Sequence, residues 1–327
     1  MKRNLLILYL LGTACIGLAG FPDPARSQPS TAVDLSGNWS ADNATDEGMD
    51  APDEPLPGNW AGIPLNASGR ALALSYDSAQ LAEPYLGLQC GYPPVYMMLG
   101  PFGLRISNLT ENNNGTTVAW RIGGWVDRGP ITIWMDGRAE PSAYAPHPRN
   151  GFATGEWVNG MLIAHVSHMP AGIAKRNGAP LSDRATMTLW FSRHGETLTV
   201  LARIVDPVYL SQPFLLTRVF LHYVSAPQSA VGEPCVMAYE GVAPDAVPFY
   251  LPGQNPLRNV VPETYGIPFS AELAGAASMY PAFRKVLRNE YRRPASCQNE
   301  LKYQTFPDRA CGGPGKYPLR GPGGTTD

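Results

Sequence analysis

The chain has 327 residues, of which 16% are charged, and its formal net charge is -2 at pH 7. Nucleic-acid-binding surfaces need an excess of basic residues, so this balance argues against nucleic acid as a partner. The 34 glycines and 33 prolines follow no collagen-like period and indicate a globular protein with many turns.

The first residues have the pattern of an export signal. Lys2 and Arg3 precede the short apolar run 5–11, and small residues follow that run. A membrane-spanning helix needs about 20 apolar residues, and neither this run nor any later one reaches that length. We predict a signal peptide over residues 1–27 and a periplasmic or secreted protein. Lipid anchoring at Cys15 is the less favoured alternative, because the usual leucine three residues earlier is absent.

Four cysteines remain after the predicted signal: Cys90, Cys235, Cys297 and Cys311. An even number of cysteines in an exported chain fits two disulfides, and four cysteines allow three pairings. The short Pro/Gly-rich loop between the last two favours Cys297–Cys311 and Cys90–Cys235, but sequence alone does not choose. Metal binding is the weaker interpretation, because no Cys-x-x-Cys pair is present.

Short apolar runs, separated by Gly, Asn, Pro and Asp clusters, follow one another through the middle of the chain. A helix is predicted over 66–83, a hairpin turn over 111–115 and a strand over 118–122. The next predicted strands are Ile131–Met135, Trp157–Val166, Thr186–Phe191, Thr197–Val205 and Leu215–Val224. Runs of this length and punctuation are typical of a twisted antiparallel sheet that buries one face.

The C-terminal part changes character. Residues 270–279 are Ala-rich and helix-like, and Pro281 suits the first position of a second helix. The basic face of that helix fits either a solvated helix that caps the barrel, which we favour, or a membrane-surface role. We predict a mainly β protein: an antiparallel lipocalin-like β-barrel over 28–250, followed by a helical extension and flexible Pro/Gly-rich tail over 251–327.

Several motifs occur in an order that resembles an uncharacterised family of exported bacterial proteins. They are Asp34-Leu-Ser-Gly-Asn-Trp39, Cys90-Gly-Tyr-Pro93, Met135-Asp-Gly-Arg138, Gly155-Glu-Trp-Val-Asn-Gly160, Asp206-Pro207 with Pro213-Phe214, and Glu233-Pro-Cys235. The likeness covers Asp34 to Cys235 and lies in the order of the motifs. Gly37-x-Trp39 also resembles the first strand of lipocalin-type barrels, in which a Trp closes the barrel floor. No function is attached to the family, so the resemblance implies export and architecture alone.

The departures from the family pattern concern polar positions. The family has a His-Ser pair where this chain has Phe152-Ala153, and a Glu-Arg pair near Leu189-Trp190. A family carboxylate falls near His165 here. If these positions face the interior, they imply a more apolar pocket that holds one or two imidazoles.

Three histidines and one aspartate are the candidate catalytic residues: His165, His168, His222 and Asp206. Period-two alternation places His165 and Ser167 on one face of a strand and His168 on the other, which argues against a shared metal. An imidazole suits proton transfer near neutral pH. The alternatives are rim histidines for the first two and a core residue for His222. Asp206 precedes Pro207, so a turn explains it, although it could also accept hydrogen bonds from Arg203 or Tyr209.

Most tryptophans lie in or beside predicted strands, where each is individually more typical of a core than of a ligand wall. Together with one tyrosine they are the candidate ligand-binding residues: Trp120, Trp134, Trp157, Trp190 and Tyr209. The chain has no Walker loop, no Gly-x-Gly-x-x-Gly and no Gly-x-Ser-x-Gly, so no cofactor and no serine nucleophile is predicted.

These observations predict an exported barrel that binds a hydrophobic small molecule, of terpenoid, aromatic or lipid-like type, in an aromatic-lined cavity. The alternative is a cofactor-independent lyase, isomerase or hydratase that acts on such a molecule by His acid–base catalysis. Both functions need a closed, apolar barrel interior.

Overall fold

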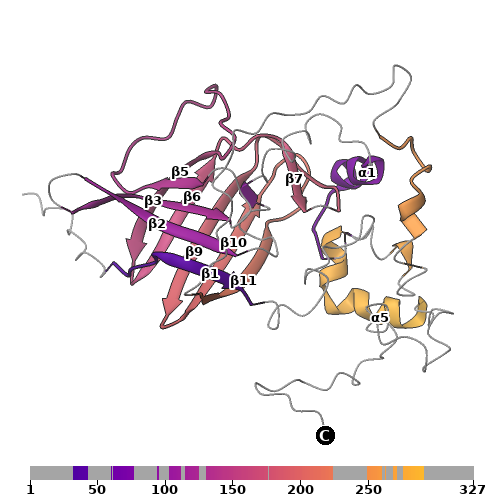
Figure 1. Cartoon of the computed structure of the whole chain (residues 1–327). Coiled ribbons are helices and arrows are strands. Elements are labelled where there is room, and N and C mark those ends of the chain that lie inside the picture. The colour runs from indigo at the N-terminus through magenta and orange to yellow at the C-terminus, as the bar shows by residue number, and fades with distance from the viewer. Residues whose placement is uncertain are drawn as a thin grey trace, which may run out of the picture.

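Nine strands of the computed structural model close into a barrel in the order β1-β11-β10-β9-β6-β5-β4-β3-β2 (Figure 1). The structure describes residues 32–42, 60, 62–76, 94–95, 103–111, 115–124, 130–175, 177–223, 249–259, 262, 268–270 and 275–290. The strands are β1 (Gly37–Ala41), β2 (Leu104–Thr110), β3 (Thr117–Gly124), β4 (Ile131–Trp134), β5 (Phe152–Val158), β6 (Met161–Ser167), β7 (Gly172–Lys175), β8 (Ala179–Leu181), β9 (Thr186–His194), β10 (Thr197–Val205) and β11 (Phe214–His222). The helices whose bounds fall within the described residues are α1 (Ala67–Ser75) and α5 (Pro281–Glu290), with 3-10 turns η2 (Pro256–Asn259) and η3 (Gly275–Met279).

Alternation along the strands builds the core inside the barrel. In β10, Leu198, Val200, Ala202 and Ile204 are fully buried, while the residues between them are partly or fully exposed. Successive strand residues point to opposite sides of a sheet, so one set fills the interior and the other meets solvent. The mainly β, lipocalin-like barrel with additional helix is therefore confirmed. Among the described helices, none is both long enough and apolar enough to cross a membrane.

Two details of the predicted sheet are wrong. The run Trp157–Val166 was predicted as one strand, but it contains the end of β5, a tight turn and most of β6. The turn residues Asn159 and Gly160 have φ values of 50° and 79°. Two left-handed residues form the tight turn that matches the twist of a hairpin, and Asn-Gly suits it best. In addition, β4 and β5 pair in parallel, so the sheet is not wholly antiparallel.

The segment before β1 closes one end of the barrel, which we call the Trp39 end. Leu35 and Trp39 are fully buried there, and the Trp39 indole N–H donates to the Leu35 carbonyl at 3.0 Å. The Arg193 guanidinium lies 5.0 Å from the Trp39 ring and donates to the Asp34 carbonyl at 2.6 Å. The pKa of the Asp34 carboxyl is lowered, chiefly because it accepts the backbone N–H of Ser36.

Helix α1 and the small sheet β7–β8 cover the opposite end, which we call the α1 end (Figure 1). Asn66 caps α1, because its side-chain oxygen accepts the Gly69 N–H at 2.9 Å. The Asn66 amide also donates to the Val208 carbonyl at 2.8 Å, which ties the helix to the segment after β10. The Trp60 indole N–H donates to the Asn177 carbonyl at 3.0 Å and attaches the neighbouring loop.

A crossover, residues 135–151, returns the chain along the outside of the barrel because β4 and β5 are parallel. Its first turn is held by Asp136, whose carboxylate accepts the Arg138 Nε–H at 2.9 Å. The Arg138 guanidinium in turn lies 3.4 Å from the centre of the Trp134 ring. This stack covers Trp134 on the outer face of β4.

Several sequence predictions lie outside the described residues. These are the signal peptide, Cys15, the four remaining cysteines and the part of the predicted tail from residue 291 onward. The predicted second helix, in contrast, begins at Pro281 as expected, and the helix predicted over 66–83 is the shorter α1.

We expect Asp206→Asn to lower the free energy of unfolding by about 2–3 kcal/mol, because hydrogen bonds to a charged group contribute about 1.5–3 kcal/mol. The buried Asp206 carboxylate accepts the Ser182 N–H and Oγ–H, both at 2.7 Å, and the Val208 N–H at 2.8 Å. Urea unfolding measures the change. The exposed neighbour Asp183→Asn is the matched control, and equal stability of the two variants would contradict the assignment.

We expect the Asp136 carboxyl to titrate near pH 2, because the Arg138 side chain hydrogen-bonds its charged form and lowers its pKa from 3.8 to about 2. A depressed folded-state pKa stabilises the fold above the unfolded pKa, and this contribution is lost as pH falls toward 2. An NMR pH titration checks the midpoint. In Arg138→Gln the midpoint should return toward 3.8, and an unchanged midpoint would exclude the pair as the cause.

Candidate functional site

The inner wall of the barrel is the candidate site, and most of it is aliphatic. Its register can be followed from strand to strand around the barrel. One row of successive cross-strand partners is Trp157, Leu162, Phe191, Val200 and Arg218. A second row consists of Trp120, Ile133, Ala153, Val166, Met187, Ile204 and Phe214. Two tryptophans thus lie at one side of a wall that also carries Phe191 and Phe214 and is otherwise mainly aliphatic.

Trp120 and Trp157 are brought together on this inner wall. Their ring centroids are 6.2 Å apart with an interplanar angle of 75°, the edge-to-face geometry that aromatic pairs favour. Trp120 is 4% exposed, whereas Trp157 is only partly buried although its neighbour Leu162 is fully buried. The β4–β5 ladder ends at Trp134–Thr154, three residues before Trp157. Solvent therefore reaches the inner wall at Trp157.

The Trp120 indole N–H is a buried donor with no hydrogen-bond acceptor in the described structure. Burying a donor without a partner costs about 1–3 kcal/mol, and buried tryptophans usually find an acceptor. Groups of this kind call for an explanation, because the great majority of buried polar atoms are satisfied. Trp120 therefore offers an unused directional contact on the inner wall.

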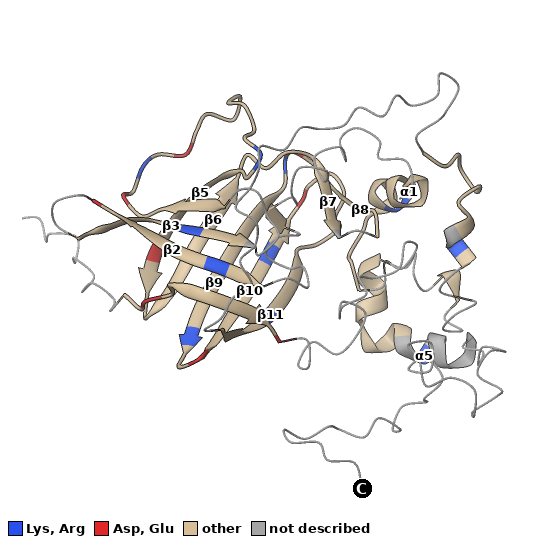
Figure 2. Cartoon of the chain, in the orientation of Figure 1, with Lys and Arg blue, Asp and Glu red and all other residues tan. Residues whose placement is uncertain are grey.

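The charged side chains at inward positions of the described barrel strands are both arginines, Arg193 at the Trp39 end and Arg218 on β11. Arg218 is 1% exposed and lies on the same face of its strand as Phe220. Charged residues are few on the barrel strands, as Figure 2 shows. Arg193 lies 3.9 Å from the Glu196 carboxylate at the Trp39 end.

His222 lies at an inward position where β11 reaches the Trp39 end. Its Nδ1 is 2.8 Å from the Glu196 carboxylate, and its ring centroid is 5.1 Å from that of Trp39. Gly37 makes room for this imidazole, because a Cβ at residue 37 would lie 2.7 Å from His222 Nε2. With φ at 136°, Gly37 also has a backbone conformation that side chains disfavour. The pair leaves Nε2 as the imidazole nitrogen not held by Glu196.

The other two candidate histidines lie outside the barrel interior. His165 is exposed on the outer face of β6. His168 is buried under the crossover, where Nε2 is 2.9 Å from the Ser142 carbonyl and Nδ1 is 2.9 Å from Ser167 Oγ. A carbonyl only accepts, so Nε2 carries a proton, and in the neutral ring Nδ1 accepts from Ser167. With φ at 52°, His168 also departs from the period-two alternation that a regular strand would have.

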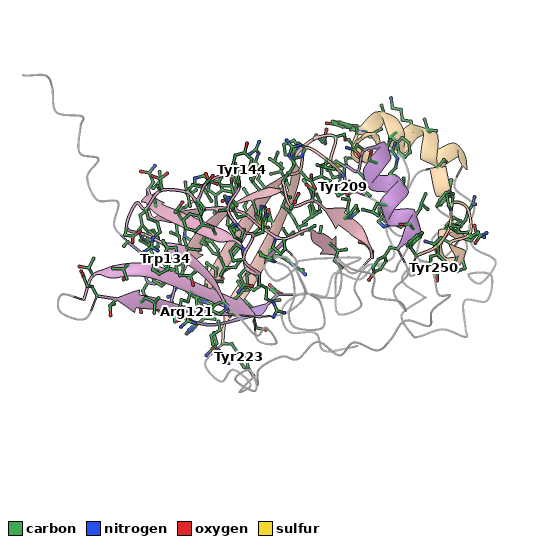
Figure 3. All side chains as sticks on the ribbon, turned by 90° about the horizontal axis from the view of Figure 1, so that it is seen from above. Arg121, Trp134, Tyr144, Tyr209, Tyr223 and Tyr250 are labelled. Carbon is green, nitrogen blue, oxygen red and sulfur yellow. The ribbon has the colours of Figure 1, made fainter. Side chains whose placement is uncertain are left out.

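The remaining candidates are spread over the surface and the α1 end. Trp134 and Trp190 occupy outward positions of β4 and β9, so neither lines the interior. Asp206 accepts hydrogen bonds from Ser182 and from backbone N–H groups after β10, including that of Tyr209. Tyr209 lies beside α1, as Figure 3 shows together with Trp134. Of the five predicted aromatic residues, the structure thus brings two together inside the barrel.

Sequence reasoning missed two residues of the interior and its rim. Arg218 follows Phe214 by four positions and precedes Phe220 by two, so strand alternation would have placed it inside. Glu196 lies in the turn between β9 and β10, and nothing in the sequence links it to His222. Within the described ranges, no group of three or more His, Cys, Asp or Glu residues is arranged to hold a metal ion.

Comparison with known proteins gives no further assignment. No model of a protein family matches the chain, and neither the curated proteins nor the solved structures contain a significant match.

Proposed function

We propose that the barrel binds an apolar small molecule, of terpenoid, aromatic or lipid-like type, against the Trp120–Trp157 pair. The observation that supports this function is the partial exposure of Trp157 at an inward position of the wall. A residue that only filled the core would be expected to be buried like its partner Leu162. The predicted signal at residues 1–27 extends the proposal to a periplasmic or extracellular protein.

The chemistry of the wall supports an apolar ligand. Aromatic and aliphatic side chains gain about 25 cal/mol for each Å² of apolar surface removed from water. A bicyclic ligand that buries about 300 Å² would gain about 7.5 kcal/mol before the cost of immobilisation. We therefore expect micromolar or weaker dissociation constants for simple hydrocarbons.

A second function, cofactor-independent proton transfer, is favoured by the His222–Glu196 pair. The carboxylate fixes the ring through Nδ1, so Nε2 is the nitrogen that would take up or deliver a proton. A lyase, isomerase or hydratase acting on an apolar molecule needs such a group and no metal or nucleotide. The inward position of His222 and its contact with Trp39 support this role.

For binding, we expect 2-decalone, trans-decalin or a medium-chain fatty acid to change the tryptophan fluorescence of the full chain in a saturable way. Trp157→Leu should weaken binding about fivefold or more, because aromatic contacts contribute beyond the area they bury. Trp190→Leu, on the outer face of β9, is the matched control and should bind normally. A flat titration with all three of these ligands and with naphthalene, an aromatic compound of the same size, would refute the binding function.

For catalysis, we expect the protein to accelerate deuterium uptake next to the carbonyl of 2-decalone in D2O, followed by NMR. His222→Gln should reduce the rate by about 100-fold or more, the usual contribution of a general base, while ligand binding remains. His165→Gln changes an exposed imidazole on the outer wall and serves as the control. If His222→Gln exchanges protons at the wild-type rate, His222 is not the base.

A further inference from the structure

We infer that the ligand carries an oxygen that accepts the Trp120 indole N–H, an inference that rests on the proposed binding function. The proposal narrows the ligand from any hydrocarbon to an apolar molecule with one acceptor oxygen, such as a carbonyl, hydroxyl or carboxylate. Its basis is the Trp120 side chain, which is 4% exposed and whose Nε1 has no acceptor among the described residues.

The strand partners of Trp120 leave its indole N–H without an acceptor, although Asn108 stands opposite it on β2. The partner of Trp120 on β4 is Ile133, and the row continues to Ala153 on β5. Both are buried hydrocarbon side chains, and their backbone groups lie in the strand ladder. The ring nearest to Trp120 is Trp157, another indole whose own N–H is a donor. A phenylalanine would fill the wall at this place without the cost of a buried donor.

A single trapped water is a poor alternative occupant. A buried water is held by two to four polar partners, and about three on average. Ile133 and Trp157 beside Trp120 carry no acceptor, and its β2 partner Asn108 is a single polar side chain where a buried water needs two or more partners. A ligand differs from water because its apolar part is held by the wall, so a single hydrogen bond is enough to orient it.

The N–H that the wall offers sets the chemistry of the ligand atom that meets it. An indole N–H only donates, so its partner must be an acceptor such as a carbonyl, hydroxyl or carboxylate oxygen. The shared chemistry is therefore an acceptor, and a neutral and an acidic ligand are the two forms to compare.

The test uses the full chain labelled with 15N and three ligands of one shape: trans-decalin, 2-decalone and decalin-2-carboxylate. The indole peak that disappears in Trp120→Phe identifies the Trp120 N–H in the NMR spectrum. We expect 2-decalone or the carboxylate to move this peak downfield, as a hydrogen bond requires, and decalin to leave it nearly in place. Trp120→Phe should weaken binding of the oxygen-bearing ligand by about 2- to 12-fold and change decalin binding less than twofold.

The outcomes separate this inference from the binding function itself. If none of the three ligands binds the wild-type chain, the proposed function fails and this inference fails with it. If decalin and 2-decalone bind but the Trp120 peak stays in place with both oxygen-bearing ligands, the inference is overturned and the function stands. An equal loss of affinity for all three ligands in Trp120→Phe would also overturn it. Trp190→Phe, on the outer wall, controls for general effects of losing an indole.

Discussion

The barrel depends on the pairing of β1 with two strands that are far apart in sequence. Trp39 stands opposite His222 of β11 on one side and Leu104 of β2 on the other. This five-residue strand therefore satisfies the edges of both neighbours, which would otherwise be open to pairing with other chains. The position of Trp39 and of Leu35 over the end of the barrel follows from this double pairing.

The weakest part of the ring lies where β4 meets β5. Their ladder comprises two residue pairs, and the chain must cross over outside the barrel to make it parallel. The turn of Asp136 and the contacts of His168 with Ser142 and Ser167 hold this crossover against the wall. Trp157 lies beyond the end of the short ladder, so the place where the ring is least complete is also where this member of the aromatic pair reaches solvent.

Much of the architecture could be predicted from alternation and punctuation, because β10 has the bounds and the apolar phase that its sequence indicates. The same signals failed where a turn carried too few breaking residues: Asn159-Gly160 lies inside an apolar run, so one strand was predicted for two. β2 was not predicted because its C-terminal half is mostly polar and begins with the consecutive residues Ser107 and Asn108.

The site was harder to predict because a strand's phase shows which residues share a face, not which face is inside. Trp120 and Trp134 are both strand tryptophans with apolar neighbours, and the register alone separates the inner one from the outer one. His168 departs from alternation through a positive φ, which no residue type nearby announces. The His222–Glu196 contact joins a strand end to a distant turn and depends wholly on the tertiary fold.

The long sequence separation across β1 and β11 also bears on how the molecule folds. Residues 39 and 222 can pair only after the intervening strands have formed their own hairpins, since closing so large a loop costs chain entropy that no local contact repays. Folding should then end with the docking of the N-terminal strand. In the folded barrel, the docked β1 buries the Trp39 ring and makes the sheet continuous.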